Sequence, residues 1–148
     1  QIRAALKSYP GLPHRMERVA EISGVAYVND SKGTNTAASA PALAAFENIH
    51  WIVGGLGKEP GLGECEAELG RVKAAYTIGR AGPDFAALLE GRVPVEQCET
   101  LDRAVASAAA KAAAGDTVLL SPACASFDQY ADFEKRGDHF RALVEGLA

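Results

Sequence analysis

The chain has 148 residues and a formal net charge of −4, with 48% hydrophobic and 23% charged residues. This length suits one compact domain, and the composition excludes a disordered tail, a collagen-like repeat and a coiled-coil rod. No apolar run reaches the roughly 20 residues that a membrane span needs, so we expect no membrane segment. A mildly acidic chain lacks the basic stripe typical of non-specific nucleic-acid binding, so we expect no nucleic-acid partner.

The N-terminus and the cysteines indicate the kind of protein from which the chain comes. It begins with Gln1, and residues 1–11 look like the end of a preceding helix and a linker, so we expect a piece of a longer protein in which residues 12–148 form one domain. Three widely spaced cysteines occur without a CxxC motif, at Cys65, Cys98 and Cys124. This pattern argues against a disulfide framework or a zinc cluster and favours a cytoplasmic protein with no metal site in this chain.

Hydrophobic periodicity and turn residues predict the secondary structure. In chain order we expect a hairpin of strands at 16–22 and 25–28, a helix at 34–46, a strand at 49–53, a short helix at 64–72, a strand at 74–78, a helix at 83–89, a strand at 93–97, a helix from the cap Thr100 to 113, a strand at 117–120 and a helix at 129–147. Pro41 favours a late start or a kink in the first helix, and Gly137 a break in the last. Strands and helices alternate after the hairpin, which predicts an α/β, Rossmann-like fold. We expect a mostly parallel open sheet with helices on both faces and an antiparallel N-terminal hairpin strand.

Ligands of such sheets gather beyond the carboxyl ends of the strands, and three loops stand out there. Asn-Asp-Ser-Lys-Gly-Thr-Asn at 29–35 offers a carboxylate, an ammonium group and hydroxyls before a helix, which indicates either an anion site or ordinary capping. Gly-Gly-Leu-Gly-Lys at 54–58 is not a P-loop, because the first glycine of GxxxxGK[ST] is missing and Glu59 follows the lysine. It is either a flexible turn or a loop that brings Lys58 to a negative ligand.

The third loop follows the last strand, at 121–129. Ser126 and Gln129 have the spacing of a capping box, and Ser126 is also a candidate donor to a ligand carboxylate. Cys124 has no histidine nearby in sequence, which argues against a nucleophile. The charged run at 134–138 is typical of a solvated helix face, and Arg15 is either a phosphate or base contact or a surface residue. The residues alone thus predict a small anionic ligand at the carboxyl edge of the sheet.

Taken together, the motifs resemble the C-terminal domain of the Mur ligase family. The motifs that carry the resemblance are Leu-Pro-His-Arg at 12–15, the loops at 29–35 and 54–58, Ser-Pro-Ala-Cys-Ala-Ser-Phe-Asp-Gln-Tyr at 121–130 and Phe-Glu-Lys-Arg-Gly at 133–137. The form Asp-Ser-Lys-x-Thr-Asn resembles that of the D-glutamate-adding members. Three residues depart from the family pattern: Leu56 stands where Asp is usual, Phe127 where Leu is common, and Gly33 where Ala is usual and should be tolerated.

The resemblance implies an ATP-dependent ligase of peptidoglycan synthesis that joins D-glutamate to UDP-N-acetylmuramoyl-L-alanine, with Mg²⁺ assisting. In the family, a central domain absent from these residues holds the P-loop and the magnesium, so the chain alone is expected to be inactive. The resemblance places the nucleotide at His14, Arg15 and Asp30, and makes Lys32 the catalytic cation. D-Glutamate would lie at Lys32, Thr34, Lys58, Ser126, Phe127 and Phe133.

Three alternatives remain open, one of which is a pure interaction domain that binds no small ligand. Folylpolyglutamate synthases resemble the Mur ligases in architecture and also add glutamate, but their motifs match this chain less well. A stand-alone Rossmann-type module that binds a nucleotide or an anion would account for the same sheet and loops, although the chain has no GxGxxG fingerprint.

Overall fold

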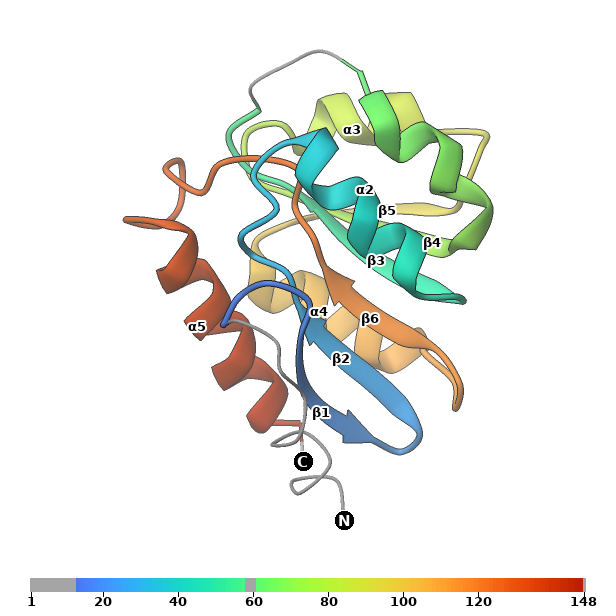
Figure 1. The fold of residues 1–148 in the computed structure, drawn as a ribbon, viewed down its shortest axis with the longest axis vertical. Coiled ribbons are helices and arrows are strands. Elements are labelled where there is room, and N and C mark those ends of the chain that lie inside the picture. Colours follow the sequence, from blue (N-terminus) through green and yellow to red (C-terminus); the bar gives the residue numbers. More distant parts are fainter. Residues whose placement is uncertain (1–12, 58–60, 148) are drawn as a thin grey trace.

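The computed structural model describes residues 13–57 and 61–147. They form a six-stranded sheet in the order β1-β2-β6-β3-β4-β5, in which only the β1–β2 pair is antiparallel (Figure 1). The elements are β1 (Glu17–Ile22), β2 (Val25–Asn29), α2 (Thr36–Ala45), β3 (Ile49–Gly54), the 3-10 helix η1 (Gly63–Arg71), β4 (Val72–Ile78), α3 (Gly82–Leu89), β5 (Val95–Glu99), α4 (Leu101–Lys111), β6 (Thr117–Leu120) and α5 (Phe133–Glu145). The predicted fold class is confirmed.

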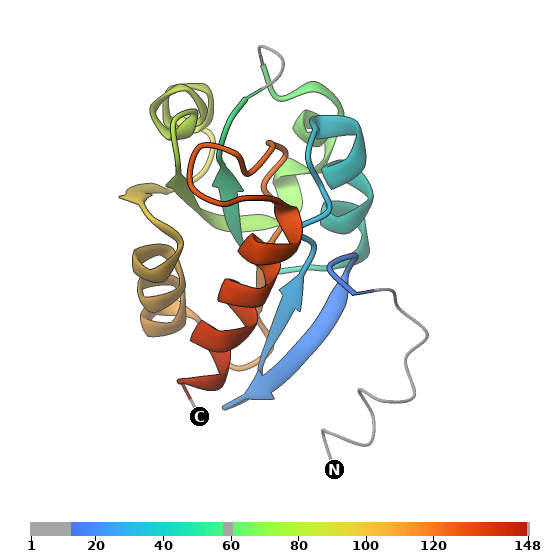
Figure 2. The same ribbon diagram turned by 90° about the vertical axis from the view of Figure 1, so that its left-hand side faces the viewer.

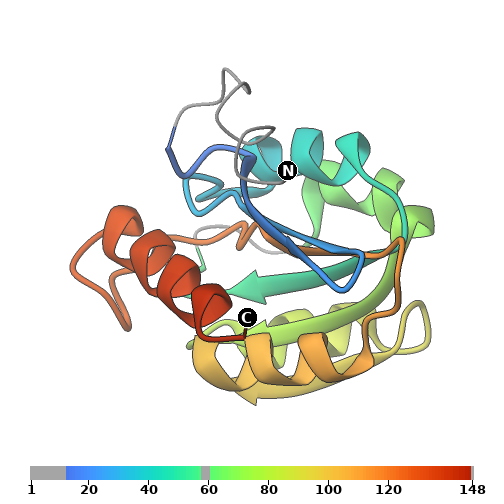
Figure 3. The same ribbon diagram turned by 90° about the horizontal axis from the view of Figure 1, so that it is seen from below.

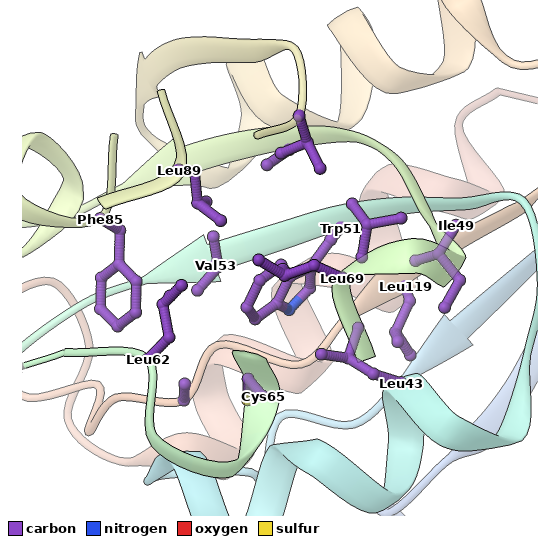
Figure 4. Close-up of a cluster of buried hydrophobic side chains, with 14 of the residues drawn as sticks. Leu43, Ile49, Trp51, Val53, Leu62, Cys65, Leu69, Phe85, Leu89 and Leu119 are labelled. Carbon is purple, nitrogen blue, oxygen red and sulfur yellow. The ribbon is translucent and has the colours of Figure 1, made fainter. Parts of the chain in front are cut away.

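Helices cover both faces of the sheet (Figure 3). One hydrophobic cluster joins the sheet to α2, η1 and α3, and a second joins it to α4 and α5. Trp51, on the central strand β3, is fully buried in the first cluster and is surrounded by leucines from both neighbouring helices and strands (Figure 4). Its indole nitrogen donates to the Ser121 carbonyl at 2.8 Å, so burying this large side chain leaves no polar atom unsatisfied.

Two predicted helices differ from the structure at their N-termini. Pro41 lies inside α2 without delaying its start, which is fixed by Asn35: the Asn35 side chain accepts the Ala38 amide at 2.8 Å. The last helix begins at Phe133 rather than at 129, because Asp132 is its N-cap and accepts the Lys135 amide at 2.8 Å. Gly137 lies within α5 and does not break it.

A buried polar network lies toward the amino ends of β3 and β6. His50 Nε2 lies 2.9 Å from Asp116 Oδ2, and His50 Nδ1 lies 2.8 Å from the Tyr76 hydroxyl. Lys73 reaches the same Asp116 carboxylate at 3.0 Å. Burial raises the pKa of Tyr76 to about 12, so its hydroxyl stays protonated and can donate to His50. The network joins β3 and β4 to Asp116, the residue before β6, at the end of the sheet opposite the strand-end loops.

None of the described helices is both long and apolar enough to span a bilayer.

Candidate ligand site at the strand-end loops

The parallel strands bring their following loops to one edge of the sheet. The loop after β3 pairs with the loop after β6: Gly54 N donates to the Pro122 carbonyl at 2.9 Å, and Leu56 and Ala125 form an antiparallel bridge. Figure 2 shows these two loops side by side above the sheet. The sequence predicted that the loops share this edge of the sheet. It did not predict that the two loops form hydrogen bonds with each other.

The glycines of the β3 loop permit this close approach. Gly54 and Gly55 have φ values of 129° and 137°, a backbone conformation that residues with a Cβ atom rarely adopt. A Cβ at Gly54 would overlap the Ile78 carbonyl, and one at Gly55 would lie 2.5 Å from the Ala125 carbonyl. The described part of this loop therefore uses its glycines to pack backbone against backbone. Lys58, the predicted cation of the loop, lies outside the described residues.

Asp30, directly after β2, is a buried carboxylate with two protein donors. Its side chain accepts the Ser121 hydroxyl at 2.6 Å and the Met16 amide at 3.0 Å, and the residue is only 3% exposed. Burial raises the pKa of Asp30 to about 6, against the lowering effect of those two hydrogen bonds and of the Arg15 and Arg136 charges. At neutral pH the carboxylate is therefore mostly ionised, and it is poised to accept hydrogen bonds.

Gly33 packs tightly against Asp30, so glycine at this position fits the structure, as expected. An added Cβ would lie 2.6 Å from Ser39 Oγ and 2.9 Å from Asp30 Oδ2. The Ser39 hydroxyl is itself fixed, because it accepts the Ala123 amide at 3.0 Å. An alanine would thus require both side chains to shift.

A cavity of about 280 Å³ opens beside Asp30. It is lined by Arg15, Met16, Asp30, Lys32, Gly33, Ala38 and Pro41. Arg15 and Lys32 are exposed, and the Lys32 ammonium lies 6.0 Å from the centre of the Phe133 ring. Two cations and one carboxylate therefore share a single concave surface. This arrangement brings together three of the predicted site residues, Arg15, Asp30 and Lys32, with Phe133 at its side.

His14 is buried behind this cavity, and both of its ring nitrogens face protein groups. Asn29 Nδ2 lies 3.0 Å from His14 Nδ1; because the amide nitrogen can only donate, Nδ1 accepts and the ring proton is on Nε2. Nε2 in turn lies 3.7 Å from Asp138 Oδ1. The His14 carbonyl also accepts the Lys32 amide at 2.9 Å. His14 is thus placed to hold the loop that carries Lys32.

Arg136 is the site residue that sequence reasoning missed. It was expected on a solvated face, but it is 1% exposed, because α5 packs against the loop after β2. Arg136 Nε donates to the Ser31 hydroxyl at 2.9 Å, and Nη2 to the Ser31 carbonyl at 2.8 Å. Burial lowers the pKa of Arg136 to about 10, which leaves it charged at neutral pH. The adjacent Gly137 was the available signal, because a glycine inside a helix often marks a close approach.

The other predicted residues divide between surface and interior. Ser126 does not cap α5. Its carbonyl accepts the Gln129 and Tyr130 amides in a turn, and its hydroxyl is buried without a partner among the residues described. Phe127 is 67% exposed, whereas Thr34 and Phe133 are half-buried. Cys124 is buried.

The described residues contain no cluster of metal ligands. In residues 13–57 and 61–147, no three His, Cys, Asp or Glu side chains come together as a metal site would require.

These features define an α/β domain whose described loops offer cations, a buried carboxylate and the unpaired buried hydroxyl of Ser126 at one edge of the sheet. The family model described as "Mur ligase, glutamate ligase domain" matches residues 14–124, and the chain belongs to this family. It is 60% identical over 145 residues to the UDP-N-acetylmuramoylalanine–D-glutamate ligase of Novosphingobium aromaticivorans. The matched region covers 98% of this chain and 33% of that protein. The ligase of the same name from Zymomonas mobilis is 53% identical over 147 residues, covering 99% and 33%.

The chain therefore spans about a third of the length of these curated relatives. Among solved structures, the UDP-N-acetylmuramate–alanine ligase of Thermotoga maritima matches with a TM-score of 0.60 at 13% identity, over 98% of this chain and 33% of that chain. A bifunctional folylpolyglutamate/dihydrofolate synthase of Yersinia pestis matches with a TM-score of 0.60 at 19% identity, over 93% and 32%. At these identities the two structures show a shared fold and do not distinguish between the two activities.

Proposed function

We propose that this chain is the D-glutamate-binding domain of an ATP-dependent ligase that joins D-glutamate to UDP-N-acetylmuramoyl-L-alanine in the cytoplasm. The observation that carries the proposal is the shared cavity of Arg15, Asp30 and Lys32 at the carboxyl edge of the sheet. In this cavity, Arg15 and Lys32 supply cations for phosphate groups, and Asp30 supplies a buried hydrogen-bond acceptor for a sugar hydroxyl. Family membership and the names of the relatives support this choice of substrates.

In the proposed reaction, ATP phosphorylates the carboxylate of the muramoyl-alanine substrate and leaves as ADP. The D-glutamate amine then attacks the acyl phosphate; the amide bond forms, the amine loses a proton and phosphate departs. Lys32 would stand beside the transferred phosphate as an exposed point charge. Asp30 would accept a ribose hydroxyl, and Arg15 would contact the phosphates or the base, while His14 holds the Lys32 loop from behind.

D-Glutamate has two carboxylates, so its site needs oriented donors. We assign these to the Ser126 hydroxyl, which is buried and unpartnered in the described structure, and to Thr34, Lys32 and Lys58. Phe127 and Phe133 would border the ligand. As the family resemblance implies, we assign the magnesium, which assists phosphoryl transfer when bound, to parts of the ligase outside this chain.

The test is phosphate release by the full-length ligase with ATP, D-glutamate and UDP-N-acetylmuramoyl-L-alanine. Lys32→Ala should lower turnover at least about a hundredfold, as expected for the loss of one preorganised charge at a transferred phosphate. Its fold should be unchanged, because the side chain is exposed. The matched control is Lys135→Ala, an exposed lysine in α5 that should retain activity.

The chain alone provides a second arm of the test. It should show no turnover. It should also bind ADP or D-glutamate more weakly than micromolar, because the relatives are about three times longer and we expect the rest of such a ligase to supply the other part of the site. Equal activity of Lys32→Ala and Lys135→Ala would contradict the role of Lys32. Glutamate addition to a folate substrate in place of the muramoyl substrate would contradict the proposed reaction.

A further inference from the structure

A second cavity lies at the carboxyl ends of β4 and β5 and shares no residue with the one beside Asp30. Its volume is about 300 Å³, room for about ten water-sized groups at ~30 Å³ each. It is lined by Thr77, Gly79, Arg80, Gly82, Pro83, Gln97 and Glu99. The proposed function uses none of these residues.

Thr77 contributes a buried hydroxyl that no described group satisfies. The residue is 1% exposed, and its Oγ1 has no hydrogen-bond partner within 13–57 and 61–147. Thr77 and Gly82 both line the cavity, and a Cβ built on Gly82 would lie 3.6 Å from both Cβ and Oγ1 of Thr77, so the Thr77 side chain packs against the Gly82 wall. Leaving a buried hydroxyl unpaired is destabilising, and such a group calls for a partner that the described part of the protein does not supply.

The N-terminus of α3 adds a positive field on the same side. The Gly82 amide donates to the Gly79 carbonyl at 3.1 Å, and Pro83 has no amide hydrogen, which leaves the Asp84 amide as the next donor at this helix end. No side chain caps the helix. Helix N-termini with open amides favour anions.

Arg80 supplies a full positive charge. Its backbone is fixed, because its amide donates to Asp128 Oδ2 at 2.8 Å, while its guanidinium has no ion-pair partner in the described part of the chain. Glu99, on the other wall, is already paired with Arg103 at 2.8 Å. Its negative charge still opposes a doubly charged ligand such as phosphate more than a singly charged one.

We propose that this cavity binds a small carboxylate anion. The carboxylate oxygens would accept from the Thr77 hydroxyl, the Arg80 guanidinium and the open amide of α3. The volume admits a molecule of up to amino-acid size, with Gln97 able to meet a second polar group of the ligand.

The test is a titration of the isotopically labelled 148-residue chain with acetate, followed by amide NMR shifts at constant ionic strength. Acetate should shift the Thr77, Arg80 and Asp84 amides with a common saturating curve. Thr77→Val, which keeps the shape and removes the hydroxyl, and Arg80→Gln should each weaken binding about tenfold. Arg92→Gln is the control, because Arg92 is exposed and pairs with Glu66 away from the cavity.

Shifts confined to Asp30 and Ser126, or the same affinity in Thr77→Val as in the control, would overturn the proposal. Inorganic phosphate binding more tightly than acetate would overturn the choice of a carboxylate. The readout is separate from the proposed ligase function, because the amides near Asp30 and those near Thr77 report independently. A chain that binds acetate at Thr77 but fails as part of a ligase would contradict only the proposed function.

Discussion

Arg136 and Ser31, 105 residues apart in sequence, are joined by two hydrogen bonds from one guanidinium. Nε donates to the Ser31 hydroxyl at 2.9 Å and Nη2 to the Ser31 carbonyl at 2.8 Å. The Ser31 hydroxyl donates onward to the Phe133 carbonyl at 2.6 Å. The turn between Asp30 and Lys32 is therefore held by the first turn of α5. The positions of Asp30, a proposed nucleotide contact, and of Lys32, the proposed catalytic cation, depend on how this helix docks.

We expect Arg136→Lys to destabilise the protein by about 2 kcal/mol. A lysine keeps the charge but cannot make the two-pronged contact with Ser31, and hydrogen bonds to charged groups are worth about 1.5–3 kcal/mol. Denaturant unfolding measures the effect. Lys135→Ala, at the neighbouring exposed position, should change the unfolding free energy by less than about 0.5 kcal/mol. Equal stability of the two variants would show that Arg136 does not hold the turn.

Gly137→Ala should destabilise, although alanine is the better helix former by about 1 kcal/mol. A Cβ at this position would overlap His14 Nδ1 and lie 3.0 Å from Asn29 Nδ2, and both side chains are buried. Gly70→Ala, in η1, is the control, because nothing lies within 4 Å of its added Cβ. In thermal unfolding, Gly137→Ala should lower the melting temperature, whereas Gly70→Ala should leave it unchanged or raise it. A stabilised Gly137→Ala variant would mean that α5 can move away without cost.

The order of elements could be predicted because it depends on local patterns. The alternation of apolar runs and turns indicated each strand within one or two residues, and β6 coincides with its prediction at Thr117–Leu120. The convergence of the loops also followed, since parallel strands place their carboxyl ends at one edge. The motifs predicted which residues of those loops form the candidate site.

The docking of α5 could not be predicted, because it depends on contacts between distant segments. The charges at 134–138 have the composition of a solvated face, yet Arg136 is buried by its fit to Ser31, and Gly137 by its fit to His14. Ser126 with Gln129 matched a capping box, but the tertiary turn at 126–130 took precedence and Asp132 became the cap. The roles of the site residues in ligand binding stay predictions.

The stability of the protein should depend on the ionisation of Asp30. Its folded pKa of about 6 lies above the ordinary value of 3.8, mainly because the carboxylate is buried. The group therefore contributes stability that is fully present below about pH 3.8 and is lost as the pH rises through about 6. The full shift corresponds to about 3 kcal/mol. Relative to Asp30→Asn, the natural protein should lose unfolding free energy between pH 4.5 and pH 7; a difference independent of pH would contradict the buried carboxylate.

Asp116 should show the opposite dependence on pH, at the other edge of the sheet. Burial alone would raise its pKa, but the Ala113 amide, His50 and Lys73 overcome this effect and lower it to about 2. Its contribution is therefore present above about pH 3.8 and is lost as the pH falls through about 2. Asp116→Asn removes the charge that faces Lys73 and leaves one acceptor for the donors of His50 and Ala113, so we expect a loss of about 2 kcal/mol at pH 7.

Denaturant unfolding at pH 7 and pH 3 tests this expectation, and the deficit of Asp116→Asn should shrink at the lower pH. The control is Glu90→Gln, an exposed residue after α3, with a change of less than about 0.5 kcal/mol at either pH. Because Asp116 lies opposite the strand-end loops, binding of ADP by the full-length ligase should be unaffected by the variant at pH 7. A deficit that grows toward pH 3 would mean that Asp116 is not the ionised partner of His50 and Lys73.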